Sequence, residues 1–581
     1  MPRLYVLDHS LVDLGGHHYE YDLHVLRAAE QAGWEPVLGS HVRCRAREHL
    51  PANWAVAPVF HFDMYSKHTV LFGRSRLPVN PFLGGAPEDR GGRSSARKRL
   101  DAWKVRWRQR RRLRLFARSC RRLFERFPPG PGDQVFLPTI SEFDLVGLAE
   151  FLRSYRHARV PDWHAQFHFG FLEGRVPEYD GQSELLHAMR AHFEHVRALI
   201  PEVRLHLYAT TPQLASQYEL LGVFPCRPLA YPVNPALAER PAGDPAGPVR
   251  VVCAGGVRDE KGTHHLRRVV EDLARDDFFG GRLQLWVQAE RVDQIPHGGA
   301  SSPVSADPGD RTVPGGTRIV HVRHPLPLDE YLRLIAAADV GLFLYDERRY
   351  AARLSAILVE MLSAGASVVV PAGCWLSDEV AEASAAHLER LAREMRGVAA
   401  RDAALPRVLR CGGTEAPAFA DCAAPEGATE LQVSFRWSAG TARGHHARIE
   451  IVQGNDRGDV LDRWAAVCGS RTDSRASIAM FHMHPEARSL RLRFSNAYFS
   501  TPIDLSDVEI RFLAADDFAG GRCPEGQVGL IAADFGQFPD LLREIARHRE
   551  HYRTAAASFS ADYFRRHHPS NVLRILTDTA G

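Results

Sequence analysis

Hydrophobic and polar positions follow a repeating order in the first part of the chain. Short apolar runs alternate with segments in which apolar residues recur every three or four positions. This order predicts strands alternating with helices, as in a doubly wound parallel sheet. A helix is expected over residues 19–33, and strands are expected at Leu4–Leu7, Pro36–Leu38, Gln134–Leu137 and Ala165–Phe169.

The same order returns in a second series that begins at Val249. A helix is expected over residues 351–364, ending at Gly365, and the all-apolar run that follows predicts a strand buried on both faces. A second parallel sheet is therefore predicted, with strands at Val249–Ala254, Leu283–Val287, Arg318–Val322, Val340–Leu344 and Ser367–Val370.

A different pattern occupies residues 408–512, where apolar and polar residues alternate with period two. Such alternation between turns is typical of an antiparallel β-sandwich. The expected strands are Leu431–Trp437, Ala447–Val452, Leu490–Phe494 and Val508–Phe512. Because the earlier pattern returns at Val528–Ile531 and in a helix over residues 538–551, we predict that the sandwich is inserted into the second α/β domain.

The fold predicted from these patterns is α/β, with two Rossmann-like doubly wound domains and an antiparallel β-sandwich inserted in the second. A chain of 581 residues is too long for one hydrophobic core. The expected boundaries are 1–235 for the first domain, 236–400 for the start of the second, 405–515 for the sandwich and 522–551 for the return. A hinge is expected at 232–248, and the helical tail 552–581 is expected to pack back on the first domain.

Composition and charge argue against several classes of protein. The net charge is only +3, and the nine cysteines form no C-x-x-C pair, which disfavours a zinc ribbon or a redox dithiol. The N-terminus is expected to be a strand and not a signal peptide. No apolar run of about 18 residues occurs, so no membrane-spanning helix is expected. These features favour a cytoplasmic protein, with attachment to a membrane surface left open.

An irregular insertion is expected over about 63–126, and it contains a strongly basic stretch. From Arg90 to Arg126 there are 16 Lys or Arg residues against two carboxylates. The later half predicts one apolar helix face, and a break is expected near Arg110; the face consists of Leu113, Phe116, Cys120, Leu123 and Phe127. Residues 93–126 fit either an exposed charged helix or a contact with anionic lipid through Trp103 and Trp107. Nucleic acid is not expected, because the rest of the chain is not basic.

Two segments of the second domain suggest chemistry. The first is the loop from Ala254 to Gly262, between a strand and a helix expected to begin at the N-cap Thr263. Glycines and a helix start allow close approach to an anion, and Arg258 and Lys261 add two positive charges. A tight turn with exposed basic residues is the alternative. The second is Glu360, away from the apolar helix face, where a carboxylate can accept two ribose hydroxyls or simply face water.

Together, Arg258-x-x-Lys261-Gly262 and the stretch from Leu354 to Val370 that contains Glu360 resemble family-four glycosyltransferases of the GT-B fold. The resemblance implies that Arg258 and Lys261 bind the donor diphosphate and that Glu360 binds the donor ribose. This family usually has a further glutamate eight residues before the ribose glutamate, where this chain has Ala352; Tyr350 or Arg353 are the nearby candidates to replace it.

The resemblance also assigns residues of the first domain. Gly15 and Gly16 match a glycine loop that faces the donor phosphates, with an ordinary strand–helix loop as the alternative. His168 matches a histidine that contacts the donor sugar or phosphate, with a core or loop histidine as the alternative. Thr139, Ser141 and Glu142 are candidates for the acceptor side.

The implied activity is glycosyl transfer from a nucleotide sugar to a glycan or lipid-linked acceptor of the cell envelope, with retention and without metal or cofactor. The catalytic candidates are His168, Arg258 and Lys261, and the donor-binding candidates are Gly15, Gly16, Gly255, Gly256, Arg258, Lys261, Gly262, Thr263, Tyr350, Arg353 and Glu360. A non-catalytic sugar or nucleotide binder and a sugar-nucleotide epimerase are the alternatives.

The predicted sandwich has three open roles: a carbohydrate-binding module, a spacer or an oligomer contact. The aromatic candidates for stacking on sugars are Trp437, Trp464, Tyr498 and Phe499. The pairs His445–His446 and His482–His484 lack further ligands, so no functional metal is expected.

Overall fold

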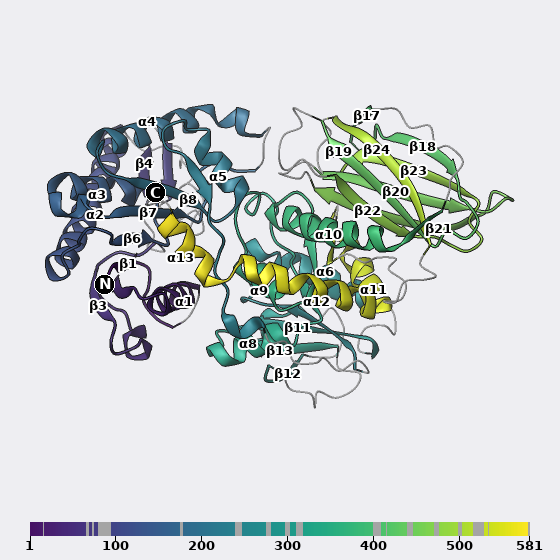
Figure 1. The fold of residues 1–581 in the computed structure, drawn as a ribbon, viewed down its shortest axis with the longest axis horizontal. Helices are drawn as coiled ribbons and strands as arrows, with labels where there is room; N and C mark the ends of the chain where they lie inside the picture. Colours follow the sequence, from purple (N-terminus) through teal and green to yellow (C-terminus); the bar gives the residue numbers. More distant parts are fainter. Residues whose placement is uncertain are drawn as a thin grey trace.

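The computed structural model shows two α/β parts side by side and a part made of β-strands beside the second (Figure 1). The described residues are 1–14, 17–64, 69–72, 75–78, 95–174, 178–238, 247–274, 281–296, 303–308, 318–398, 408–413, 415–438, 446–469, 476–497, 502–514, 528–532 and 534–578.

The first domain is built on a parallel seven-stranded sheet with the order β3-β2-β1-β6-β7-β8-β9. Its strands are β1 (Arg3–Asp8), β2 (Glu35–His41), β3 (Ala55–Phe60), β6 (Gln134–Leu137), β7 (Asp162–Phe167), β8 (Leu205–Ala209) and β9 (Cys226–Pro228). The helices include α1 (His17–Gln31), α2 (Ser95–Arg126), α3 (Glu142–Ser154), α4 (Ser183–Leu199) and α5 (Pro212–Glu219). Strand β7 ends at Phe167, so His168 follows the strand and does not lie within it as expected.

The second domain repeats this architecture with the strand order β12-β13-β11-β10-β14-β15-β25. Its strands are β10 (Val249–Cys253), β11 (Leu283–Ala289), β12 (Val304–Ser305), β13 (Ile319–Arg323), β14 (Val340–Leu342), β15 (Ser367–Pro371) and β25 (Gly529–Ala532). The helices include α6 (Thr263–Leu273), α8 (Leu328–Ala336), α9 (Ala356–Ser363), α10 (Trp375–Glu394) and α11 (Phe538–Arg547). The prediction of two doubly wound parallel sheets is thus confirmed.

Helix α9 begins later than the expected residue 351. The side chain of Ser355 accepts a hydrogen bond from the backbone N–H of Leu358 at 3.3 Å and so caps the helix. Residues 351–354 form a turn before it. Ala352 therefore lies outside the helix that carries Glu360, whereas the expected helix 351–364 included both residues.

Between β15 and β25, which are neighbours in the second sheet, the chain forms two antiparallel sheets. Their orders are β16-β24-β19-β22, with β17 on β24, and β18-β23-β20-β21. Inward side chains of both sheets share one apolar cluster. The strands are β16 (Arg396–Val398), β17 (Val408–Cys411), β18 (Ala418–Ala423), β19 (Glu430–Trp437), β20 (His446–Gly454), β21 (Val460–Gly469), β22 (Ser477–His482), β23 (Ser489–Asn496) and β24 (Ile503–Ala514).

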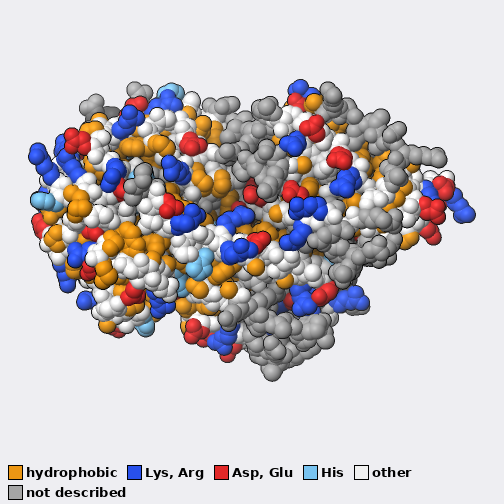
Figure 2. All heavy atoms as spheres, in the orientation of Figure 1, with side chains coloured by type: hydrophobic (Ala, Val, Ile, Leu, Met, Phe, Trp, Pro, Cys, Tyr) orange, Lys and Arg blue, Asp and Glu red, His pale blue; other side chains and the backbone are white. Residues whose placement is uncertain are grey.

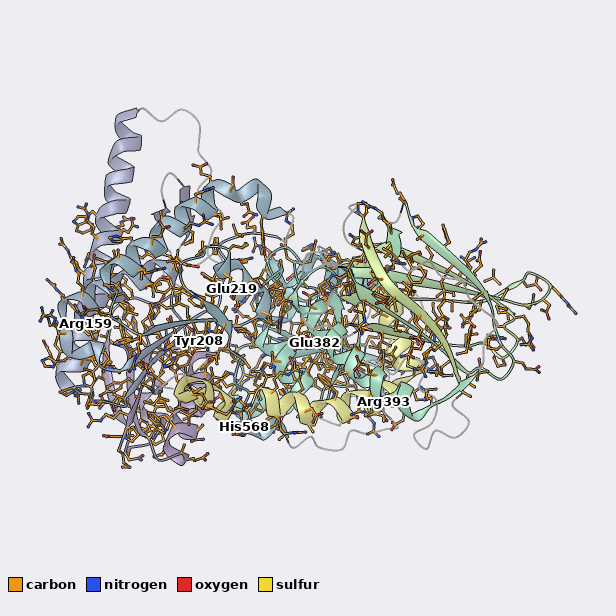
Figure 3. All side chains as sticks on the ribbon, turned by 45° about the horizontal axis from the view of Figure 1, so that its top comes forward. Arg159, Tyr208, Glu219, Glu382, Arg393 and His568 are labelled. Carbon is orange, nitrogen blue, oxygen red and sulfur yellow. The ribbon has the colours of Figure 1, made fainter. Side chains whose placement is uncertain are left out.

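The basic stretch forms a single long helix, α2, whose N-terminal turns project from the first domain (Figure 3). The expected break near Arg110 is wrong, and β4 (Thr69–Phe72) and β5 (Ser75–Pro78) form a hairpin in the stretch expected to be irregular. The predicted apolar face is confirmed, because Phe116, Cys120 and Leu123 are buried. Basic side chains gather at the left edge of Figure 2, over α2 and α3.

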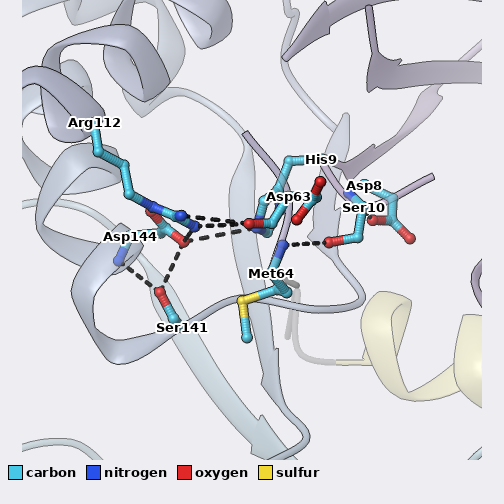
Figure 4. A network of polar contacts seen from close by, with 8 residues as sticks. All are labelled: Asp8, His9, Ser10, Asp63, Met64, Arg112, Ser141 and Asp144. Atoms are coloured by element: carbon cyan, nitrogen blue, oxygen red, sulfur yellow. Dashed lines mark hydrogen bonds and ion pairs between the residues drawn. The ribbon is translucent and has the colours of Figure 1, made fainter. Parts of the chain in front are cut away.

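One arginine of α2 points into the protein, and its contacts explain why the helix continues past Arg110, where a break was expected. Arg112 is buried one turn before Phe116 and binds both carboxylate oxygens of Asp144, at 2.7 and 2.6 Å (Figure 4). Asp144 also accepts a hydrogen bond from the hydroxyl of Ser141 at 2.7 Å. A bidentate ion pair with an added donor satisfies both buried charges, so the buried stripe of α2 extends through a charged position.

The last two helices connect the domains. Helix α12 (Arg549–Arg566) packs on α9 and α10 of the second domain, and α13 (Pro569–Asp578) packs on α1 of the first. His568 lies at the junction of the two helices (Figure 3). At this point Nδ1 of His567 is 2.7 Å from the carbonyl oxygen of Tyr231, and the N–H of Val233 donates to the carbonyl of His567 at 3.0 Å. The outgoing and returning segments between the domains are therefore joined to each other.

Candidate active site

The strand orders indicate where a ligand can bind. In the first sheet β1 lies between β2 and β6, and in the second β10 lies between β11 and β14. At these positions the chain connections leave toward opposite sides of the sheet. Ligands of open α/β sheets bind outside the carboxyl ends of such strands. The loop after β10 contains the basic residues singled out in the sequence.

The loop after β10 folds tightly around Lys261. Gly255, Gly256 and Gly262 have φ angles of +86°, +75° and +72°, which favour glycine. A methyl group at Gly255 would lie 2.2 Å from Nζ of Lys261, and one at Gly262 would lie 1.8 Å from the carbonyl oxygen of Leu344. A side chain at these positions would therefore overlap neighbouring atoms as well as strain the backbone.

Thr263 has a role different from the predicted one. Helix α6 does begin at Thr263, but its N-cap is Gly262, and no side chain caps the helix. The hydroxyl of Thr263 donates instead to the carbonyl of Arg258 at 2.8 Å, which closes the loop that carries Arg258 and Lys261.

The ammonium group of Lys261 points back into the loop. Its Nζ donates to the carbonyl of Gly255 at 2.9 Å and lies 5.5 Å from the ring centre of Tyr345. Burial, with the nearby charges of Arg258 and Arg353, lowers the pKa of Lys261 to about 7. Because the charged form of Lys261 is disfavoured at this position, an anion that binds beside it stabilises that charged form.

Arginines surround a buried carboxylate next to Lys261. The carboxylate of Glu260 is 8% exposed, and guanidinium nitrogens of Arg258, Arg349 and Arg353 lie at 3.9, 4.0 and 3.6 Å from it. The side chain of Arg258 is 58% exposed, so most of its donors remain accessible. Glu260 thus fixes the arginines without neutralising all of their charge.

Glu360 lies near Lys261, on the adjacent helix α9. The hydroxyl of Tyr331, on α8, donates a short hydrogen bond to Oε2 of Glu360. Burial and the carboxylate of Glu20, on α1 of the first domain, raise the pKa of Glu360 to about 7, against the effects of Tyr331 and Lys261. The structure therefore brings together Lys261, Glu360 and a residue of the opposite domain.

The turn at 350–353 also connects the domains. The guanidinium carbon of Arg353 lies 4.5 Å from the ring centre of Tyr350 and 5.6 Å from that of Phe169, which follows β7. Tyr350 is buried against Tyr345, with ring centres 4.5 Å apart. Arg353 thus reaches the edge of the first domain, and the buried ring of Tyr350 packs against its guanidinium group.

Ala352, at the position of the missing family glutamate, packs into the hydrophobic core of the first domain and is 6% exposed. No acidic group stands at this position of the turn. Ala352 therefore cannot supply the carboxylate that the resemblance would place at this position.

His168 lies at the same edge of the first domain. Its Nε2 is 2.8 Å from the carbonyl oxygen of Pro138, which fixes this nitrogen as a donor. Burial, with the nearby His18, lowers the pKa of His168 to about 4. The ring is held neutral, so it can position a neighbour but is a poor general base at neutral pH.

A buried pair, Asp8 and His18, was not identified from the sequence. Nδ1 of His18 is 2.7 Å from Oδ2 of Asp8, at the end of β1. Although burial opposes ionisation of Asp8, the imidazole lowers the pKa of Asp8 to about 2. A carboxylate that orients an imidazole is an arrangement suited to proton transfer. An aspartate at a strand end followed by histidines at the next helix start was the available signal.

His324, after β13, was also not identified. A methyl group at Gly256 would lie 2.9 Å from Cδ2 of His324, so the ring lines the glycine loop. Its Nδ1 is buried and makes no hydrogen bond to any residue that the structure describes. Burial and the charges of Arg258 and Lys261 lower the pKa of His324. A buried ring nitrogen without a partner beside two cations is a candidate ligand contact.

Other candidates have structural roles or lie outside the described residues. Gly15, Gly16, Tyr498, Phe499 and His445 are outside them. Ser141 caps α3, and Glu142 accepts a short hydrogen bond from Tyr218, so these two are engaged within the first domain, while Thr139 is buried 3.5 Å from the His168 ring. His446 is buried 3.1 Å from Asp378.

Across the described ranges, no group of three or more His, Cys, Asp or Glu residues is placed to hold a metal ion. In the same ranges, no helix combines the length and the apolar character needed to cross a bilayer.

Neither a protein-family model nor a curated protein matches the chain. Solved structures do. The chain is similar to trehalose-6-phosphate synthase OtsA, with 12% identity, a TM-score of 0.42 and coverage of 65% of this chain and 86% of that chain. It is similar to a UDP-forming trehalose-phosphate synthase from Burkholderia xenovorans, with 14% identity, a TM-score of 0.40 and coverage of 66% and 86%. It is similar to HepE from Anabaena in complex with UDP-glucose, with 11% identity, a TM-score of 0.38 and coverage of 65% and 83%.

Proposed function

We propose that this protein is a glycosyltransferase that moves a sugar from a nucleotide-sugar donor to a glycan or lipid-linked acceptor. The observation that supports this proposal best is the convergence of Lys261, Arg258 and Glu360 at one edge of the second sheet, facing the first domain. Cations beside a glycine loop suit a diphosphate, and a carboxylate one helix away suits the ribose diol.

The chemistry follows from the charges of these groups. Lys261, Arg258 and the start of α6 stabilise negative charge that grows on the leaving diphosphate. His324 lies beside the same loop and can contact a phosphate oxygen. Arg353 and the neutral His168 define the side of the site that faces the first domain. These cations supply the neutralisation for which other enzymes use a metal.

The stereochemical outcome depends on which face of the anomeric carbon the acceptor attacks. The resemblance implies retention, with the leaving phosphate as the base. The Asp8–His18 pair offers another base from the first domain. If it activated an acceptor on the face opposite the leaving phosphate, the anomeric carbon would be inverted. We propose retention, and NMR of the anomeric proton in the product distinguishes the two outcomes.

A thermal-shift screen with UDP, GDP and ADP, followed by assays of donor hydrolysis and sugar transfer, tests the proposed function. We expect one diphosphate to raise the melting temperature and the corresponding sugar nucleotide to be consumed. Arg258→Ala and Lys261→Ala should lose both effects, whereas Arg333→Ala, on the adjacent α8, should keep them.

Two other outcomes would replace the proposal. Nucleotide binding without turnover would indicate a non-catalytic binder, a function for which Ala352 is the supporting observation. Interconversion of free sugar nucleotides would indicate an epimerase.

A further inference from the structure

A cavity lies away from the candidate active site. It has a volume of about 610 Å³ and opens between the sheet β18-β23-β20-β21 and the segment formed by β25 and α11. Residues of β21 and of α11 both line the cavity, and β21 contacts β25. The cavity therefore has one wall from the antiparallel insertion and one from the second domain.

Strand register explains why the wall formed by the insertion is basic. Ile449 and Ile451 of β20 are buried in the core, so the alternate residues Arg448 and Glu450 face the cavity. On β23, Leu490 and Leu492 likewise point inward, and Arg491 and Arg493 point outward. Arg463 of β21 is paired with Val452 and shares this outer face.

The lining carries more positive than negative charge. Five arginines line the cavity, Arg448, Arg463, Arg491, Arg493 and Arg547, against three carboxylates, Glu450, Asp540 and Glu544, which leaves an excess of two positive charges. Glu450 holds Arg448 at 2.9 Å and Arg493 at 2.5 Å. Arg463 and Arg547 are exposed and form no ion pair within the part of the chain that the structure describes.

An exposed aromatic ring completes the lining. Phe419, on β18, is 56% exposed and pairs in register with Arg493. Its ring lies next to the arginine–glutamate row, and a flat apolar ring beside charged hydrogen-bonding groups suits the face and the edge of a sugar. Trp464, one of the residues expected to stack on sugars, also lines the cavity, but it lies opposite Ile451 and packs against the core, and its Nε1 donates to Asp462.

We propose that this cavity binds an acidic saccharide chain. Arg463 and Arg547 match carboxylate groups, the Arg448–Glu450–Arg493 row offers both donors and acceptors to hydroxyls, and Phe419 stacks on a pyranose ring. The three carboxylates in the lining disfavour a nucleic acid, whose phosphates require a more uniformly basic surface. We identify this saccharide as the acceptor of the transfer reaction, held by the antiparallel sheets. That identification rests on the proposed function.

Calorimetric titration of the full chain at physiological salt tests this site, without any nucleotide present. The probes are hexagalacturonate, the neutral maltohexaose, a single-stranded oligothymidylate and inorganic phosphate. We expect hexagalacturonate to bind and the other three not to bind. Phe419→Ala and the double variant Arg463→Ala with Arg547→Ala should each weaken binding by about tenfold or more, and Arg457→Ala, on an exposed turn outside the cavity, should not.

Three results would overturn the proposal: equal binding of maltohexaose, binding of oligothymidylate or phosphate in place of hexagalacturonate, or unchanged affinity in the double variant. Since both arginines are exposed, the variants should keep the wild-type melting temperature. Because no donor is used, saccharide binding that persists in a chain without transferase activity rejects only the proposed function. Transfer activity without saccharide binding rejects only this site.

Discussion

The hydroxyl of Thr211, at the start of α5 in the first domain, donates a hydrogen bond of 2.6 Å to the carbonyl of Ala352 in the second. The methyl group of Ala352 is buried in the core of the first domain. A glutamate there would bury an unpaired carboxylate, so Ala352→Glu should lower the free energy of unfolding by about 3 kcal/mol and should not make sugar transfer faster. Urea unfolding and the transfer assay measure both quantities.

The matched control is Ala352→Ser, which keeps the backbone contact with Thr211 and adds only a hydroxyl group. Its stability should stay much closer to that of the wild type. A stable Ala352→Glu variant with faster transfer would show that the turn is free to present a carboxylate to the donor.

Lys261 should take up a proton when the donor diphosphate binds. Its pKa of about 7 leaves most of the side chain neutral at pH 8, and a bound anion favours the charged form. Calorimetry of the preferred nucleoside diphosphate in two buffers with different ionisation enthalpies should show uptake of close to one proton. Lys261→Arg should bind without uptake, because arginine is always charged. Binding to the wild type without uptake would contradict this role for Lys261.

Glu360 should make stability depend on pH. Its folded-state pKa is raised to about 7 from 4.5, so its stabilising contribution is full below pH 4.5 and is lost as the pH rises through 7. Relative to Glu360→Gln, the wild type should therefore lose about 2–3 kcal/mol between pH 4.5 and pH 8. Urea unfolding at both pH values measures this difference. Glu184→Gln, at an exposed position, is the control variant.

Alanine substitutions at Gly262 and Gly33 distinguish the cost of backbone strain from the cost of steric overlap. Both have positive φ, but a methyl group at Gly33 meets nothing within 4 Å, whereas one at Gly262 meets Leu344. Gly33→Ala should cost about 1–2 kcal/mol from backbone strain alone. Gly262→Ala should cost more than 3 kcal/mol and abolish nucleotide binding. Equal melting temperatures for the two variants would contradict the tight loop.

Arg112→Met should destabilise the first domain by about 3–5 kcal/mol, because it leaves Asp144 buried and without its arginine. Arg114→Met, on the exposed face of the same helix, should change stability by less than about 0.5 kcal/mol. Chemical unfolding of both variants provides the test. If the two costs were the same, Arg112 would not be buried against Asp144 of α3.

The parallel sheets were predictable because their strands are buried runs, such as Leu4–Leu7 and Val249–Cys253, separated by helical periodicity. The basic glycine loop was predictable for a similar reason, since all its members are close in sequence. The exact start of α9 was not, because the cap at Ser355 is one hydrogen bond and the apolar pattern runs through it.

The contacts that define the candidate site beyond this loop depend on the tertiary fold. Glu360 meets Tyr331 from another helix, and Glu20 approaches it from the other domain. His324 belongs to a different strand end from the glycine loop that it lines. Buried Arg112 was hidden among fifteen other basic residues between Arg90 and Arg126, because only its partner Asp144 distinguishes it.

The contacts among Tyr231, Val233 and His567 determine how the two halves can move. The chain passes between the domains on the way out and on the way back, and both passages are fastened at this one place. Two bodies joined at two adjacent points can rotate about them but cannot slide or separate there, and such a rotation would break the contact between Thr211 and Ala352. Opening and closing over a donor would therefore be a rotation about an axis through these residues, with the largest displacement at the ends of the domains farthest from His567.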